Sequence, residues 1–200
     1  VYFVKTQGTG DRSVNKDLGF TRAHHVMLSY GFKISDNMNM KIEPYFQQLY
    51  DVPVIADSSY SVLNRRDFYV ENALVNRGKG RNIGVDITLE RYLNKGLYYM
   101  VTASIFDSKY YGGDRKWRNT LYNRNFIVNV LGGKEWMVGR DRQNMFSVNF
   151  KITLQGGDRY APVDEVATLL DPDREVQYDE TKAFSKQFSP MFITNFSVGY

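Results

Sequence analysis

Three carboxylates, Glu43, Asp86 and Glu90, come closest in this sequence to residues whose types and spacing could do catalytic chemistry. They occupy polar positions of two alternating segments, so we expect them on one face of a sheet, where paired carboxylates can act as general acid and base. No nucleophile or oxyanion-donor pattern accompanies them, and the sequence contains neither G-x-S-x-G nor H-E-x-x-H. Lys41 and Lys151 can pair with the acids on that face. The pattern therefore predicts a polar interior surface, and we expect no enzyme.

The motifs that could bind a metal ion or a phosphate are weak. His24 and His25 are adjacent, and adjacent residues of a strand point to opposite faces, so they do not readily share one metal. The glycine-rich run 78–84 precedes a strand and does not link a strand to a helix, as a phosphate-binding loop would. The acidic run 171–180 matches no defined calcium loop. The chain has no cysteine, which excludes thiol chemistry. We therefore expect no metal and no cofactor.

Aromatic side chains in two long polar segments are the candidate ligand contacts. Aromatic faces beside an arginine suit a sugar, a chelate or a peptide. The same rings could instead pack long loops together, because loops of this length need internal packing of their own. The candidates are Tyr60, Tyr111, Trp117 and Arg118, with Phe68, Tyr69 and Tyr110 beside them in the same two segments.

The elements that must position these residues are strands, because apolar and polar residues alternate with period two along almost the whole chain. The clearest example is 146–155, where Phe146, Val148, Phe150, Ile152 and Leu154 share one face. One helical turn is expected near 163–170. The predicted fold is all-β, an antiparallel up-and-down meander of about seven strands, with an eighth short strand possible at Val1–Lys5. The seven strands are 23–33, 38–50, 81–92, 97–107, 121–134, 144–155 and 190–200.

Short and long connections alternate strictly along this meander. The short ones are 34–37, 93–96 and 135–143, and the long polar ones are 51–80, 107–120 and 156–188. Outer-membrane barrels have short periplasmic turns and long extracellular loops, with an apolar face toward lipid and a polar face toward the lumen. Two alternatives stay open. One is a soluble β-barrel or sandwich with the apolar face inside, and the other is a complete small outer-membrane barrel such as an adhesin.

The composition of the chain is compatible with an outer-membrane barrel. The chain has 200 residues, of which 42% are hydrophobic and 15% aromatic, and its formal net charge is +4. The mean hydropathy is −0.45, and no run approaches the roughly 18 apolar residues of a spanning helix. Lysine and arginine are scattered among acids, so we expect no nucleic-acid partner. The sequence starts without an initiator methionine or a signal peptide, so we expect an internal segment of a longer protein or a processed product.

An ordered set of motifs carries a resemblance to a known family. In chain order they are NKDLGFTRAHH at 15–25, KIEPYFQQLYDVPV at 41–54, NRGKGRNIGVDITLER at 76–91, DSKYYGGDRKWRNT at 107–120, GGKEW at 132–136 and QGGDRYAPVD at 155–164. Together they resemble the C-terminal barrel part of TonB-dependent outer-membrane receptors. The Bacteroides type, which carries a carboxypeptidase-regulatory-like domain before its plug, is the most similar.

The resemblance implies that residues 1–200 form one partial barrel domain of a receptor whose barrel has 22 strands and a plugged lumen. Such receptors take up a scarce solute, here a glycan, a chelate or a peptide, across the Gram-negative outer membrane. The implied partners are outer-membrane lipid, the plug and remaining strands, and the TonB energy-transducing complex. Some related systems add a surface lipoprotein. This sequence contains no plug and no TonB-contacting box, so transport is implied only for the whole receptor.

Overall fold

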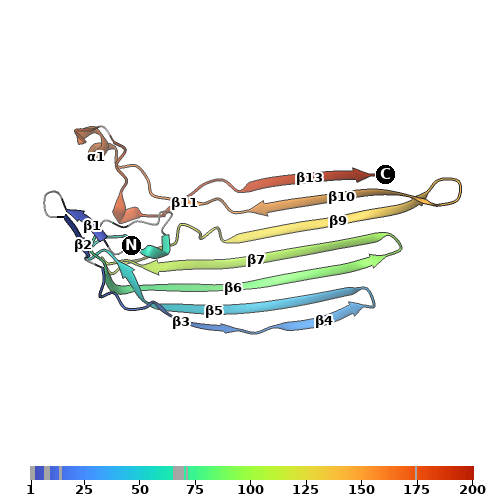
Figure 1. Cartoon of the computed structure of the whole chain (residues 1–200), viewed down its shortest axis with the longest axis horizontal. Coiled ribbons are helices and arrows are strands. Elements are labelled where there is room, and N and C mark those ends of the chain that lie inside the picture. Colours follow the sequence, from blue (N-terminus) through green and yellow to red (C-terminus); the bar gives the residue numbers. More distant parts are fainter. Residues whose placement is uncertain (1–2, 7–9, 14, 65–69, 71, 174) are drawn as a thin grey trace.

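The computed structural model describes residues 3–6, 10–13, 15–64, 70, 72–173 and 175–200. The described chain is all-β, and one antiparallel sheet contains most of its strands (Figure 1). The strands of that sheet are β3 (Arg22–Met27), β4 (Tyr30–Ser35), β5 (Met38–Val54), β6 (Val75–Asn94), β7 (Leu97–Tyr111), β8 (Trp117–Asn119), β9 (Phe126–Val138), β10 (Asn144–Gln155) and β13 (Met191–Gly199).

The sheet is an up-and-down meander. Its order is β13-β10-β9-β7-β6-β5-β3, with β4 also paired to β5 and β8 paired to the end of β7. The predicted meander of seven strands is confirmed, except that the first predicted strand, 23–33, is split into β3 and β4. The split lies opposite Pro44, whose carbonyl accepts from the Leu28 amide at 3.1 Å. Proline has no amide hydrogen to donate in return, so the ladder is interrupted there.

The eighth strand expected at Val1–Lys5 does not join this sheet. Val1 lies outside the described residues, and Phe3–Thr6 forms β1, which pairs with β2 (Gly10–Ser13) in a separate two-stranded sheet. The short segment finds a partner within its own hairpin, only a few residues away along the chain. A short strand at this position is therefore confirmed, and it lies outside the meander.

The short connections gather at one end of the sheet (Figure 1). The β6–β7 turn consists of Lys95 and Gly96, whose φ angles are 51° and 75°. Two consecutive positive φ angles are typical of the tight hairpin turn whose twist matches that of the strands. The β4–β5 connection is equally short. The third connection is 139–143, shorter than the predicted 135–143 because β9 continues to Val138.

At the opposite end the strands run further than the sequence predicts. Strand β5 reaches Val54 and β6 begins at Val75, so the predicted loop 51–80 contains two strand ends. The glycines of 78–84 conceal the strand, because Gly78 lies against Val52 and Val54 and leaves no room for a side chain. The predicted strand 121–134 starts later, at Phe126.

The two faces of the sheet differ in chemistry. The register places apolar side chains in rows across all strands of one face, which we call the apolar face. One row is Tyr30, Ile42, Ile87, Ala103, Val128, Leu154 and Phe192, and the next is Phe32, Met40, Leu89, Val101, Val130 and Ile152. Ile105 is 56% exposed and Phe196 74% exposed. Within the described part of the chain, no element packs over the middle of this face.

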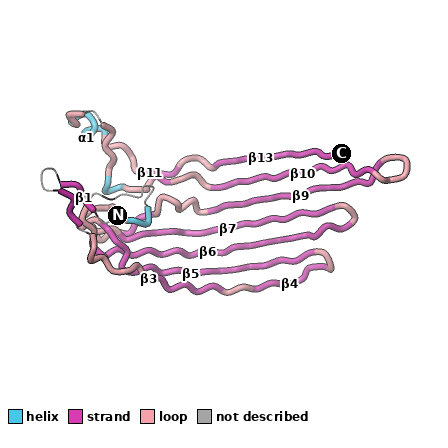
Figure 2. Tube along the Cα trace, viewed as in Figure 1, coloured by secondary structure: helices cyan, strands magenta, loops and turns pink. Residues whose placement is uncertain are grey.

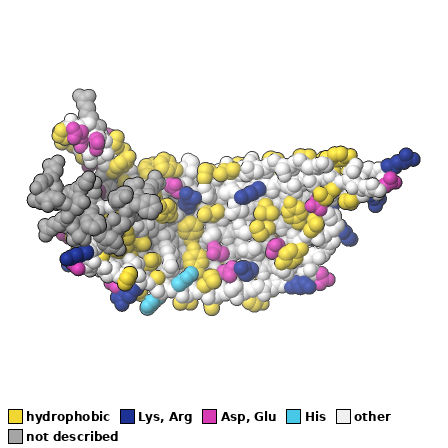
Figure 3. All heavy atoms as spheres, in the orientation of Figure 1, with side chains coloured by type: hydrophobic (Ala, Val, Ile, Leu, Met, Phe, Trp, Pro, Cys, Tyr) yellow, Lys and Arg dark blue, Asp and Glu magenta, His cyan; other side chains and the backbone are white. Residues whose placement is uncertain are grey.

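Hydrogen bonds between side chains link the strands across the other face, which we call the polar face. Asn82 donates to Gln47 at 2.7 Å and accepts from Ser108 at 2.5 Å, which joins β5, β6 and β7. Thr153 donates to Asn129 at 2.8 Å and so joins β10 to β9. In the orientation of Figure 1, charged side chains of both signs lie over the middle of the sheet, with hydrophobic side chains between them (Figure 3).

Fully buried side chains occur at the end of the sheet that carries the long connections. Val52, Val54 and Tyr110 at the strand ends are completely inaccessible. Around them lie buried residues of the connections, namely Ser59, Ser61, Val70, Leu74, Thr120, Leu121, Asn123 and Ala183. Figure 2 shows the loops and helical segments gathered at this end. The buried core of the described chain thus lies among the long connections and the strand ends that they cover. We call this region the loop layer.

The loop layer holds the remaining small elements. They are the 3-10 turns η1 (Val62–Asn64) and η2 (Glu180–Lys182), the strand pair β11 (Arg159–Tyr160) and β12 (Lys186–Gln187), and helix α1 (Glu165–Leu170). Asp164 caps α1 by accepting from the Ala167 amide, which confirms the helical turn predicted near 163–170. Within the described residues, no helix is long and apolar enough to cross a bilayer.

Candidate functional site: the loop layer

In the structure the three long connections between strands of the meander are 55–74, 112–125 and 156–190. Hydrogen bonds hold them together as one layer. The Leu121 amide donates to Asn64 Oδ1 at 2.8 Å, which joins the first connection to the second. Arg124 and Asp158 form an ion pair at 2.7 Å, which joins the second to the third. Ser58 Oγ donates to Glu180 at 3.1 Å, which joins the first to the third. The layer is therefore a built structure able to hold side chains in fixed positions.

The repeated sequence Gly-Gly-Asp-Arg, at 112–115 and 156–159, has a packing role in this layer. A side chain at Gly113 would collide with the Ile55 carbonyl, and one at Gly156 would collide with the Arg124 carbonyl. Each Gly-Gly pair thus lets one connection approach the backbone of another. The repeat is thus explained by the construction of the loops.

Arg118 is held by a carboxylate of its own connection. Its guanidinium donates two hydrogen bonds to Asp114, at 2.8 and 2.6 Å, and its side chain is 7% exposed. These hydrogen bonds lower the pKa of Asp114 and raise that of Arg118. The same guanidinium lies 3.4 Å from the Thr181 carbonyl of the third connection. In the described geometry, Arg118 is a structural link between connections.

Tyr111 and Trp117 lie together, but on the apolar-face side of the sheet. They are register partners on β7 and β8, and their ring centroids are 5.5 Å apart. Tyr110, the preceding residue, points the other way into the loop layer, where its ring meets Phe184 edge to face at 6.1 Å. The alternation of strand residues therefore separates the Tyr111–Trp117 pair from Arg118, which lies opposite Tyr110.

Tyr60 lines a cavity of about 560 Å³ within the loop layer. This size falls in the range of small-molecule sites. Three connections contribute to its wall, which combines aromatic rings with Ser59, Ser61, Asn64 and Glu180. The Asn64 side-chain nitrogen is buried and has no hydrogen-bond partner, although its oxygen is occupied by Leu121. A ligand with a hydrogen-bond acceptor could satisfy that nitrogen after a small adjustment.

The third connection supplies aromatic residues of this cavity that the sequence did not single out. They are Tyr160, Tyr178, Phe184 and Phe188. Tyr160 and Phe188 stack with centroids 4.4 Å apart, which β11–β12 pairing brings about. The only available signal was the recurrence of aromatics in a polar segment. The structure thus brings Tyr60 together with these rings and not with Tyr111, Trp117 or Arg118, while Phe68 and Tyr69 lie outside the described residues.

Burial and pairing also set the electrostatics of the third connection. Thr181 and Lys182 both donate to Asp179, and these hydrogen bonds lower the pKa of the carboxyl to about 2. Arg159 donates to the Asn123 carbonyl at 2.8 Å, and burial lowers its pKa. In the acidic run, Asp171 accepts from the amides of Asp173 and Glu175 and thereby orders its own turn. Among the described residues, no cluster of acidic or histidine side chains has the geometry of a metal site.

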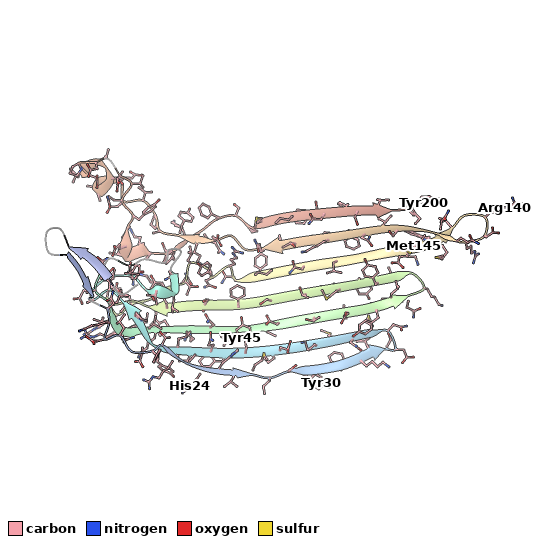
Figure 4. The ribbon with its side chains drawn as sticks, viewed as in Figure 1. His24, Tyr30, Tyr45, Arg140, Met145 and Tyr200 are labelled. Carbon is pink, nitrogen blue, oxygen red and sulfur yellow. The ribbon has the colours of Figure 1, made fainter. Side chains whose placement is uncertain are left out.

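The carboxylates and histidines considered for chemistry lie apart from the loop layer. On the polar face, Glu43 forms an ion pair with Lys41 at 2.8 Å, and Asp86 accepts from Ser104 at 2.6 Å. His24 and His25 lie on opposite faces of β3, each against a different tyrosine. Figure 4 shows His24 at the edge of the sheet. These groups have structural partners, and none of them faces a cavity of the loop layer.

Comparison with known proteins gives no relative for this chain. No family model, no curated protein and no solved structure matches it.

Proposed function

We propose that this chain is a segment of the β-barrel wall of a TonB-dependent outer-membrane receptor that takes up a scarce solute. The observation that carries the proposal is the apolar face. It extends across every strand of the meander, and nothing in the described chain covers it. Exposing an apolar surface of this extent to water is energetically unfavourable, whereas contact with the acyl chains of a membrane is favourable.

The height of the apolar face supports a membrane location. On β6 the apolar residues Ile83 to Leu89 lie between Arg81 and Arg91, which are ten residues apart on the same face. At about 3.3 Å per residue, and with the tilt of about 40° usual in such barrels, that distance corresponds to about 25 Å. This equals the height of the apolar band of outer-membrane barrels. On β6, charged residues thus begin where the hydrocarbon would end, whereas on β7 Asp107 already lies opposite Ile83.

The difference between the two ends of the sheet also supports a membrane location, and it gives the sheet an orientation in the membrane. Short turns lie at one end and the loop layer lies at the other, as periplasmic turns and extracellular loops would (Figure 2). The polar face would line the lumen, where its hydrogen-bonded side chains would meet the plug and water. Both outer strands, β3 with β4 on one side and β13 on the other, pair on one edge only within the described chain. Further strands of the receptor would pair with those edges.

The loop layer is the place where the solute would meet this segment. The cavity around Tyr60 opens among aromatic rings and polar groups, with Arg159 and Glu180 also in its wall. Such a wall suits a glycan, a chelate or a peptide. The proton-gradient-driven TonB complex would act through the plug of the whole receptor, and a surface lipoprotein would cap the loops in systems that use one.

The absence of cysteine from these 200 residues makes a sharp test of membrane location possible, once any cysteine elsewhere in the full-length protein has been replaced by serine. Single cysteines placed in turn at 146–155 in the full-length protein, in native outer-membrane vesicles, can each carry a nitroxide spin label. We expect labels at Phe146, Val148, Phe150 and Ile152 to be accessible to oxygen, which concentrates in lipid. Labels at Ser147, Asn149 and Lys151 should be accessible to a water-soluble nickel complex. If all labels along the strand were equally accessible to both reagents, or if labels at the even-numbered positions were accessible to neither, a lipid-facing sheet would be contradicted.

Transport requires a separate test in cells. A strain lacking the gene should lose growth on one class among glycans, iron chelates and peptides supplied as limiting nutrients. The full-length gene should restore that growth, and an uncoupler of the proton gradient should abolish the restored uptake. Unchanged growth on all three classes would reject the transport role and would leave the membrane location to the spin-label result.

A further inference from the structure

Four side chains form a compact patch at the loop-layer end of the apolar face. The register places Lys79 beside Tyr111 and Tyr111 beside Trp117, while Arg81 lies two residues from Lys79 on the same strand and face. We call this patch, consisting of Lys79, Arg81, Tyr111 and Trp117, the basic–aromatic patch. Lys79, Arg81 and Trp117 are exposed to solvent.

The rings hold the two cations in place. Lys79 Nζ lies 5.8 Å from the Tyr111 ring centroid, and Arg81 Cζ lies 5.6 Å from the Trp117 centroid. Because the two rings also contact each other, at 5.5 Å between centroids, the four side chains form one unit. A cation over a ring keeps its N–H donors free for an anion, since the ring contributes no hydrogen-bond acceptor of comparable strength.

The patch carries positive charge that no carboxylate neutralises in the described structure. Neither Lys79 nor Arg81 is among the ion pairs of the described residues. The nearest acid in the register is Asp107, which faces Ile83 and pairs with Lys109 at 3.3 Å. Two exposed cations on one face of a strand, with Cα atoms about 7 Å apart, can both reach one phosphate group with their long side chains.

The position of the patch indicates which kind of molecule carries that phosphate. The next residue along the same face of β6 is Ile83, which is 49% exposed. On β7 the paired residues Lys109 and Asp107 come first, and Ile105, which is 56% exposed, follows them. Aromatic rings at such a border belong at the headgroup level of a bilayer. An anion bound there would be one whose acyl chains cover Ile83 and Ile105.

We propose that the basic–aromatic patch binds the phosphate group of an anionic membrane lipid, with Lys79 and Arg81 as the ligating residues and Tyr111 and Trp117 as their support. The proposal rests on the membrane location proposed above. The lipid would act as a fixed component of this side of the wall, adjacent to the second connection of the loop layer.

Native mass spectrometry of the full-length protein tests this directly. The protein is released from micelles that contain equal amounts of phosphatidylglycerol and phosphatidylcholine, and the retained lipids are counted. We expect wild type to retain phosphatidylglycerol preferentially. Lys79→Gln and Arg81→Gln should each weaken that retention about fivefold, the effect of one cation at a lipid surface. Trp117→Leu keeps both cations and should weaken it by about two- to fivefold.

The control removes two cations elsewhere in the same region. Arg115→Gln with Lys116→Gln changes exposed residues of the second connection and should leave lipid retention unchanged. Equal retention by wild type and the Lys79→Gln/Arg81→Gln variant would overturn the proposal, provided that both show the same β-sheet circular dichroism. Displacement of the lipid by excess inorganic phosphate would also overturn it, since the site would then bind free anions. If the spin-label scan shows lipid access while this result is negative, only the patch is rejected.

Discussion

The Tyr98 hydroxyl donates a 2.8 Å hydrogen bond to Asn149 Oδ1 across an intervening strand. Tyr98 is on β7 and Asn149 on β10, and the residue between them in the register is Gly133 of β9. A side chain at Gly133 would collide with both Asn149 Oδ1 and the Tyr98 ring. The glycine therefore opens a gap on the polar face that the tyrosine fills, and three strands share one contact.

This contact predicts strong coupling between two substitutions. Tyr98→Phe should lower the free energy of unfolding by about 1 kcal/mol, the usual net value of one hydrogen bond. Gly133→Ala should cost at least as much, because its methyl group displaces both partners. The double variant should cost less than the sum, since the bond can be lost only once. Urea unfolding of the full-length protein in micelles measures all three, and strict additivity would show that Gly133 acts elsewhere. Gly31→Ala is the control, because a methyl group there meets only ordinary contacts.

Charge on the apolar face should cost more at its middle than at its border. Ile87 lies midway between Arg81 and Arg91 on β6, and Ile83 is the first apolar residue after Arg81. We expect Ile87→Arg to destabilise the protein in lipid vesicles by about 2–4 kcal/mol and Ile83→Arg by about 1 kcal/mol or less. Unfolding titrations in vesicles measure the difference. Equal costs at the two positions would argue against a membrane boundary between them.

The ion pair of Arg118 and Asp114 should be a major support of the loop layer. Asp114→Asn would leave a guanidinium that is 7% exposed without its carboxylate. Removing one partner of a largely buried pair costs about 3 kcal/mol or more. The exposed pair of Arg22 and Asp51 is the control, and Arg22→Ala should cost less than about 1 kcal/mol. The comparison requires the free energy of unfolding of both variants, and a cost for Asp114→Asn no larger than the control would contradict this role.

The third connection should lose stability in acid. The pKa of Asp179 is lowered from 3.8 to about 2, so the carboxylate stabilises the folded state fully above its ordinary pKa. That contribution is lost as the pH falls from about 4 toward about 2, because the carboxyl then takes up a proton. The protection factors of the amides of residues 175–185, which correct for the intrinsic pH dependence of hydrogen exchange, should therefore fall across this window.

In Asp179→Asn the same amides should exchange faster at neutral pH, and the acid-dependent change should largely disappear. Asp36→Asn, at the far end of the sheet, is the matched control, because its carboxylate is 96% exposed in an ion pair with Lys33. Identical exchange profiles in wild type and Asp179→Asn would show that the lowered pKa does not stabilise this connection.

Alternation was enough to predict the meander, because a strand that separates two environments must change residue type at every step. The clean pattern of 146–155 became β10 with its predicted faces. Positions 78–80 were not predicted as strand, because Gly78 and Gly80 lie against side chains of neighbouring residues and carry none of their own to show an alternation. The partner of β1 could not be predicted, since pairing depends on which edge is nearest in space.

The candidate site was predictable only in part. Tyr60 was chosen for its type, and it does line the cavity of the loop layer. Trp117 and Arg118 were chosen together, but adjacent residues of β8 lie on opposite sides of the sheet. The aromatics of the third connection were missed, because the pairing of β11 with β12 brings Tyr160 to Phe188 and has no periodic signal.

The two unlike edges of the sheet have a consequence for assembly. Tyr30 and Tyr200 mark the opposite margins in Figure 4. A strand edge offers its free amides and carbonyls to any extended chain, and two different edges on one molecule can join copies head to tail. Such a series closes into a ring only if its cumulative curvature brings the last edge to the first, and otherwise it grows into a filament. Two copies of this segment would therefore be able to join through unlike edges.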